Sequence, residues 1–99
     1  MNKALAKNIR RLARLELRGA RIVTLTERAT KAGNTALVEA YGKETKRRAA
    51  EANYLSLRVE ADLEDLDADG LKEAGALRDA VLAGSRGSST AKAIVAGAG

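Results

Sequence analysis

The sequence contains no cysteine, histidine, proline, phenylalanine or tryptophan, and its only aromatic residues are Tyr41 and Tyr54. Without cysteine and histidine, the chain cannot form disulfides, attack through a thiol, build the usual zinc sites or use imidazole for acid–base chemistry. Its carboxylates gather in a solvated acidic run, and no glycine-rich strand-to-helix loop suggests a nucleotide site. We therefore expect a protein that is not an enzyme, with no cofactor and no small-molecule substrate.

Long apolar runs are also missing. No segment approaches the roughly 20 apolar residues that a membrane-spanning helix needs, and the first residues lack the uncharged core of a signal peptide. We expect no membrane span, and a cytoplasmic location, or a place in the virion if the protein is viral.

Alanine is abundant, with 21 residues among 99. Alanine favours helices but buries little area, so a core of leucine, isoleucine, valine and alanine stabilises each helix locally while tertiary packing stays thin. Absence of proline permits long helices. A short chain of this kind is commonly stabilised by association, so we expect a homo-oligomer or a complex with other subunits.

Apolar periodicity predicts an all-α fold with helices at about 2–32, 36–66 and 71–83. Gly33-Asn34 is a good helix stop because both residues tolerate the left-handed conformation, and Asn34 or Thr35 can cap the next helix. The first two helices then form either an antiparallel hairpin or one continuous rod. Residues 1–84 are the predicted helical domain, and the Gly/Ser/Ala-rich residues 85–99 are a C-terminal tail that we expect to dock on a neighbouring subunit.

The first predicted helix is amphipathic. One side carries the apolar residues Leu5, Ile9, Leu12, Leu15, Gly19, Ile22 and Val23, and the other the basic residues Lys3, Lys7, Arg10, Arg14, Arg18, Arg21 and Arg28. Basic residues outnumber acidic ones by nine to two in residues 1–31, whereas acidic residues outnumber basic ones by eight to two in residues 59–84. This asymmetry indicates a charged partner, pairing between the two halves, or both.

In a hairpin about Gly33-Asn34, residues whose numbers sum to roughly 67 lie side by side. Lys3 and Lys7 would then face the acidic residues Glu60, Asp62, Glu64 and Asp65. Arg18 and Arg21 would face Lys46, Arg47 and Arg48, giving a positive patch at the waist of the hairpin. Arginine forks suit phosphates, so this patch predicts sequence-independent contact with a DNA or RNA backbone. The candidate residues are Arg14, Arg18, Arg21, Lys43, Lys46, Arg47 and Arg48.

The run Asp65-Leu-Asp-Ala-Asp-Gly70 resembles the first half of an EF-hand calcium loop. The resemblance implies ligands at Asp65, Asp67, Asp69 and Glu73, with Gly70 at the bend. However, Ala76 stands where the family has its bidentate glutamate. We therefore interpret the run as a helix end followed by an N-cap at Asp69, and keep a weak calcium-binding module as a second alternative function.

Four apolar residues outside the expected core are candidate contacts with a partner. Leu17 and Leu25 lie on or beside the basic stripe, and Ile94 and Val95 lie in the tail. Isolated exposed leucines are also ordinary surface features, so this pattern alone leaves both interpretations open.

The pairing of long alanine-rich helices with a small-residue tail resembles the style of small helical virion proteins of tailed bacteriophages. That resemblance implies a structural subunit associated with a capsid, portal or tail. We therefore expect a non-enzymatic assembly subunit that uses its basic helix and tail for subunit contacts. The alternative is a helical protein that binds nucleic acid without sequence preference.

Overall fold

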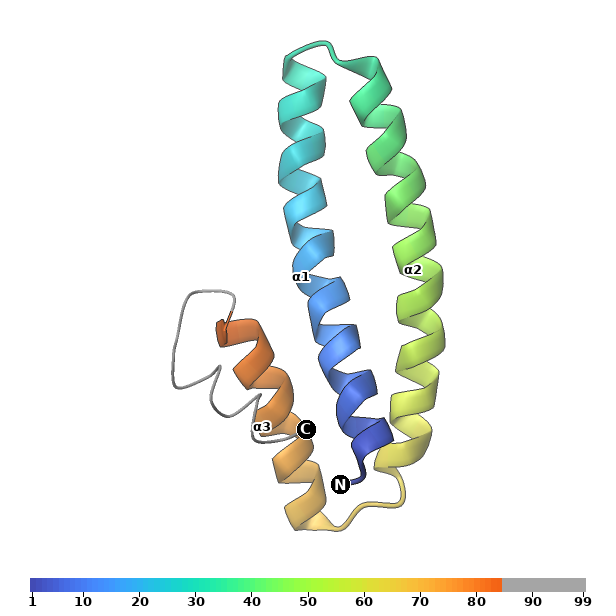
Figure 1. Ribbon diagram of the computed structural model, residues 1–99, viewed down its shortest axis with the longest axis vertical. Coiled ribbons are helices and arrows are strands. Elements are labelled where there is room, and N and C mark those ends of the chain that lie inside the picture. The colour runs from blue at the N-terminus through green and yellow to red at the C-terminus, as the bar shows by residue number, and fades with distance from the viewer. Residues whose placement is uncertain (85–99) are drawn as a thin grey trace.

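The computed structural model describes residues 1–84, which form three α-helices and no strand within that range. The helices are α1 (Lys3–Lys31), α2 (Thr35–Leu63) and α3 (Ala68–Gly84). α1 and α2 run antiparallel as a long hairpin, and α3 turns back beside the N-terminal half of α1 (Figure 1). The predicted all-α class is confirmed, and of the two arrangements left open for the first two helices, the structure has the hairpin.

The turn between α1 and α2 is made by the residues that the sequence marked. Gly33 has a positive φ of 70°. The amides of Gly33 and Asn34 donate to the carbonyls of Thr30 and Ala29 at 3.1 and 2.9 Å, which is the Schellman pattern of a helix end. The Asn34 side chain then accepts from the amide of Leu37 at 3.1 Å and caps α2. Two adjacent residues therefore end one helix and begin the next.

The turn between α2 and α3 differs from the expectation. α2 ends at Leu63, and α3 begins at Ala68 rather than near Leu71. The cap is Asp67, whose Oδ1 accepts from the amide of Gly70 at 2.8 Å, so the predicted cap at Asp69 is wrong. Asp69 lies instead in the first turn of α3. The shift reflects N-cap chemistry: the capping oxygen accepts from the amide three residues on, and Asp67 reaches that of Gly70.

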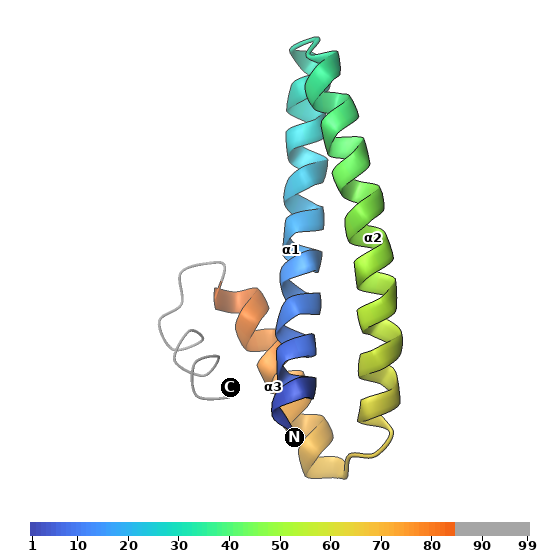
Figure 2. The same ribbon diagram turned by 45° about the vertical axis from the view of Figure 1, so that its right-hand side comes forward.

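The core lies where α1 meets both of the other helices. Its central residues are Leu5, Ala6, Ile9, Val59, Ala74 and Leu77. α1 packs against α2 and against α3, so α1 is the helix that the other two share. Figures 1 and 2 both show that the far half of the hairpin, toward the α1–α2 turn, has no third helix among the described residues.

This short third helix changes which side chains are buried. Leu5, Ile9, Leu15 and Ile22 are buried as expected, but Val23 remains 59% exposed. Among residues 1–84, no helix other than α2 packs on α1 around Val23, so one flank of α1 is open there. The far half of the hairpin is consequently held by fewer apolar contacts than the half that carries α3.

Candidate functional site

The waist of the hairpin is organised by one carboxylate. Glu44 on α2 accepts from Arg18 Nε at 3.0 Å across the hairpin and from Arg48 Nε at 2.8 Å along α2. The side chain of Glu44 is only 16% exposed. Hydrogen bonds from Arg18 and then from Arg48 hold the pKa of Glu44 below its ordinary value, and the bond to Glu44 raises that of Arg18. At the waist of the hairpin, two of the arginines are therefore paired with one glutamate.

A second bridge ties the same two helices together. Arg11 donates to Glu51 through Nε at 2.8 Å and through a terminal nitrogen at 3.0 Å. This fork-to-carboxylate hydrogen bonding lowers the pKa of Glu51 and raises that of Arg11. Arg11 and Arg18 are seven residues apart, as are Glu44 and Glu51, so the two bridges repeat along one edge of the hairpin.

Two expected charge relationships across the hairpin are therefore corrected. Arg18 reaches Glu44 and does not simply face Lys46, Arg47 and Arg48, so the waist is less positive than predicted. Lys3 and Lys7 are exposed and form no ion pair within residues 1–84. The cause is helical phase: Lys7 points about 200° away from Leu5, which packs in the shared core.

The seven candidate nucleic-acid contacts fall into two groups. Arg18 and Arg48 share Glu44, and Lys43 lies 3.6 Å from Glu39. The other four are exposed and have no ion-pair partner among the described residues: Arg14, Arg21, Lys46 and Arg47. With Lys7 and Arg28, which are likewise exposed and unpaired there, Arg14 and Arg21 form a row at seven-residue spacing on α1, about 10 Å apart in rise. We call Lys7, Arg14, Arg21 and Arg28 the basic row.

The candidate calcium ligands have other roles in the structure. Asp67 caps α3, and Glu73 lies 3.8 Å from the amino group of Met1. Within residues 1–84, no cluster of three acidic side chains is arranged to hold a metal ion. The structure thus does not bring Asp65, Asp67, Asp69 and Glu73 together as a ligand set.

The candidate apolar contacts are only partly accessible. Leu17 and Leu25 are half-buried. Ile94 and Val95 lie outside the described residues, so docking of the tail stays a prediction. Within residues 1–84, the most exposed large apolar side chains are instead Tyr54 and Leu57, on α2. Sequence reasoning missed this pair because its helical neighbours on the same side are alanines, which give a weak apolar signal.

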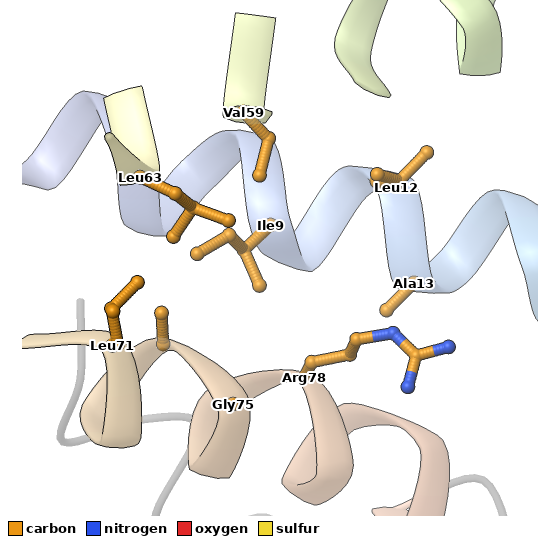
Figure 3. Close-up of a pocket in the computed structure, with 9 residues that line it drawn as sticks. Ile9, Leu12, Ala13, Val59, Leu63, Leu71, Gly75 and Arg78 are labelled. Atoms are coloured by element: carbon orange, nitrogen blue, oxygen red, sulfur yellow. The ribbon is translucent and has the colours of Figure 1, made fainter. Parts of the chain in front are cut away.

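A hollow of about 200 Å³ lies between the three helices. Figure 3 shows Ile9, Leu12 and Ala13 of α1 between Val59 and Leu63 of α2 on one side and Leu71, Gly75 and Arg78 of α3 on the other. Among the described residues that line it, Arg78 is the only charged one, and it pairs with Glu16 at 2.9 Å. An arginine does not lose its proton in a protein, so the hollow offers no general base.

No helix among the described residues combines the length and apolar character needed to cross a membrane. Comparison with protein families, with curated proteins and with solved structures finds no match to this chain.

Proposed function

We propose that this protein is a non-enzymatic structural subunit that assembles with copies of itself. The observation that carries the proposal is the set of large apolar side chains left outside a small core. They are Val23, Leu37, Tyr54, Leu57 and Leu71. Single exposed apolar residues are ordinary, but Tyr54 and Leu57 lie three residues apart on one helix and are both more than 60% exposed.

The size of the core supports the same proposal. Among residues 1–84, five of the thirteen buried hydrophobic residues are alanines, which contribute little apolar area each. Two-helix packing beyond the end of α3 adds further exposed surface. Chains with a core of this size commonly gain stability by burying apolar surface against a partner.

The hollow between the helices supports a role without catalysis. Its lining is apolar apart from Arg78, whose charge is already engaged by Glu16. A catalytic pocket needs a group that can take or give a proton, or a nucleophile, close to the substrate. None of the residues lining this hollow supplies either.

The particle that we propose for this subunit is a phage virion, with the chain associated with the capsid, portal or tail. Support for that finer assignment comes from the resemblance in sequence style. The long hairpin of α1 and α2 is compatible with it because an elongated helix pair offers several faces to neighbouring subunits.

Sedimentation equilibrium of the full chain tests the assembly role. The expected result is a mass that rises with protein concentration and changes with salt, because both apolar and charged surfaces are available. A mass equal to that of one chain at every concentration and salt level would overturn the proposal.

A second candidate function, contact with a nucleic-acid backbone, is favoured by the basic row. Its four cations lie on one side of α1 and have no acidic partner among the described residues. Such a row can neutralise successive phosphates without reading bases, and the binding would weaken steeply with salt.

A further inference from the structure

The outer side of α2 carries a short apolar strip. Ala50, Tyr54, Leu57 and Ala61 follow one another at intervals of four, three and four residues, so they share one side of the helix. All four are exposed, with Tyr54 at 64% and Leu57 at 61%. We call these four residues the α2 strip. It lies opposite Leu55 and Val59, the buried residues of α2.

Opposite charges stand at the two ends of the α2 strip. Lys46 and Arg47 precede it, and Glu64 and Asp65 follow it. None of these four has an ion-pair partner within residues 1–84. Arg47 and Glu64 are separated by about 25 Å of helix rise, which exceeds the Debye length of about 8 Å at physiological salt. The two ends therefore act as separate, unsatisfied charges.

We propose that the α2 strip binds the α2 strip of a second copy of this chain, with the two helices antiparallel. This inference deepens the proposed assembly role and rests on it. In this dimer the twofold axis passes between Tyr54 and Leu57. A residue of one chain then lies at the same height as the partner residue for which the two residue numbers add up to about 111. Tyr54 then packs against Leu57 of the partner subunit, and Ala50 against Ala61 of the partner subunit. Small alanines at the outer positions let the helices approach closely.

The charges select this arrangement over the parallel one. In the antiparallel register, Arg47 lies level with Glu64 of the partner subunit, the residue that caps the C-terminal end of α2. Twofold symmetry makes this pair twice. A parallel pair would instead place Arg47 against Arg47 of the partner subunit, which is repulsive. The surface is thus complementary to itself, which argues for a second copy as the occupant.

Neither of the other two helices that the structure describes covers this side of α2. The buried residues of α2 face α1, and α3 packs on α1. The strip is only about 17 Å long, so we expect a dimer that depends on protein concentration.

An apolar substitution tests the strip. The double variant Tyr54→Gln/Leu57→Gln should weaken self-association by roughly a hundredfold or more, because each dimer loses the burial of four side chains. Val23→Gln is the matched control, since Val23 is a large apolar residue exposed to a similar extent on α1. Sedimentation equilibrium gives the dissociation constants, and circular dichroism checks that helix content is unchanged. Equal effects of the control and the double variant would overturn the proposal.

A charge exchange tests the register. Arg47→Glu alone and Glu64→Lys alone should each weaken the dimer by roughly tenfold, since each creates two like-charge contacts. The combined variant Arg47→Glu/Glu64→Lys should recover most of the lost affinity, because the exchanged charges attract again. Additive losses in the combined variant would contradict this register.

Disulfide formation tests the orientation, since the natural chain contains no cysteine. Ala50→Cys/Ala61→Cys should link two chains on oxidation, whereas Ala50→Cys alone should not. Linkage through Ala50→Cys alone would show a parallel pair and overturn the antiparallel one.

If the chain assembles but no strip variant changes its mass, the strip proposal fails and the assembly role stands. If the chain is always a monomer, both fail.

Discussion

Arg18 on α1 donates through Nε to Glu44 on α2 at 3.0 Å, and this contact joins the two long helices at their middle. Glu44 also accepts a hydrogen bond from Nε of Arg48, so one carboxylate lies between two guanidinium groups. The far half of the hairpin has no third helix among the described residues. At this level the ion pairs of Glu44 add to the apolar packing of Leu15 and Ile22, which are buried on either side of Arg18 along α1.

Acidification should weaken the hairpin through Glu44 and Glu51. Both carboxyl groups have pKa values lowered by arginine hydrogen bonds, so the unfolded chain binds more protons than the folded one as pH falls. The stability they contribute is fully present above the ordinary glutamate pKa of about 4.3, and it is lost as pH falls from there through the lowered pKa of each group. Thermal melts followed by circular dichroism from pH 7 to pH 3 should show this loss.

Glu44→Gln isolates the contribution of this residue. The variant should melt at a lower temperature than the natural chain at pH 7 and should lose less stability between pH 7 and pH 3. Glu39→Gln is the control, because Glu39 is exposed and pairs only with Lys43 on its own helix. A Glu44→Gln variant with the natural pH dependence would show that this cluster does not set the acid response.

The docking of α3 should depend on Leu77. Leu77 is 2% exposed and packs in the core formed with α1 and α2. Leu77→Ala should reduce the free energy of unfolding by about 2–5 kcal/mol, because it removes buried methyl groups and leaves a cavity. Leu71→Ala should cost less than about 1 kcal/mol, since Leu71 is about half exposed. Urea unfolding measures both, and equal costs would contradict the described packing of α3.

The elements that were predicted well are those fixed by local chemistry. Gly33 and Asn34 mark the hairpin turn because backbone conformation and capping depend on adjacent residues. Val23 lies on the apolar side of the first predicted helix, but it is 59% exposed in the structure. Its burial depends on how far α3 extends along α1, which the pattern of α1 alone does not show. The ion pairs at the waist could not be predicted from the sequence alone. The long side chain of Arg18 reaches Glu44, which lies a few residues along α2 from the residues directly across from Arg18.

The candidate binding surfaces differ in the same way: a pattern within one helix could be predicted, whereas contacts between helices could not. The sequence showed the basic row because its seven-residue spacing is visible in α1 alone. It did not show which basic residues are neutralised, since Glu44 meets Arg18 only after the chain folds back. The α2 strip was readable in principle from its intervals of four, three and four residues. Two alanines among its four members made that signal weak beside the leucine-rich core side.

Asp67 should stabilise α3 as its N-cap, with or without calcium. Asp67→Ala should lower the free energy of unfolding by about 1 kcal/mol, since the amide of Gly70 loses its acceptor. Asp69→Ala should cost less, because Asp69 acts only through the helix dipole in the first turn. Urea unfolding with calcium and with a chelator gives both values. Stabilisation by micromolar calcium that Asp67→Ala abolishes would restore the calcium-module alternative.

Nucleic-acid contact should depend on the basic row and not on base sequence. Arg14→Gln/Arg21→Gln removes two exposed cations without breaking an ion pair of the described residues. If the row meets phosphates, this variant should bind every duplex more weakly, and the slope of log affinity against log salt should become shallower by about 2.

Lys31→Gln/Lys72→Gln is the control because it removes the same net charge from outside the row. Fluorescence anisotropy with two unrelated duplexes at several salt concentrations measures these slopes. Equal losses in the two variants would show that net charge alone drives binding, and a natural chain that ignores DNA at low salt would remove this function altogether.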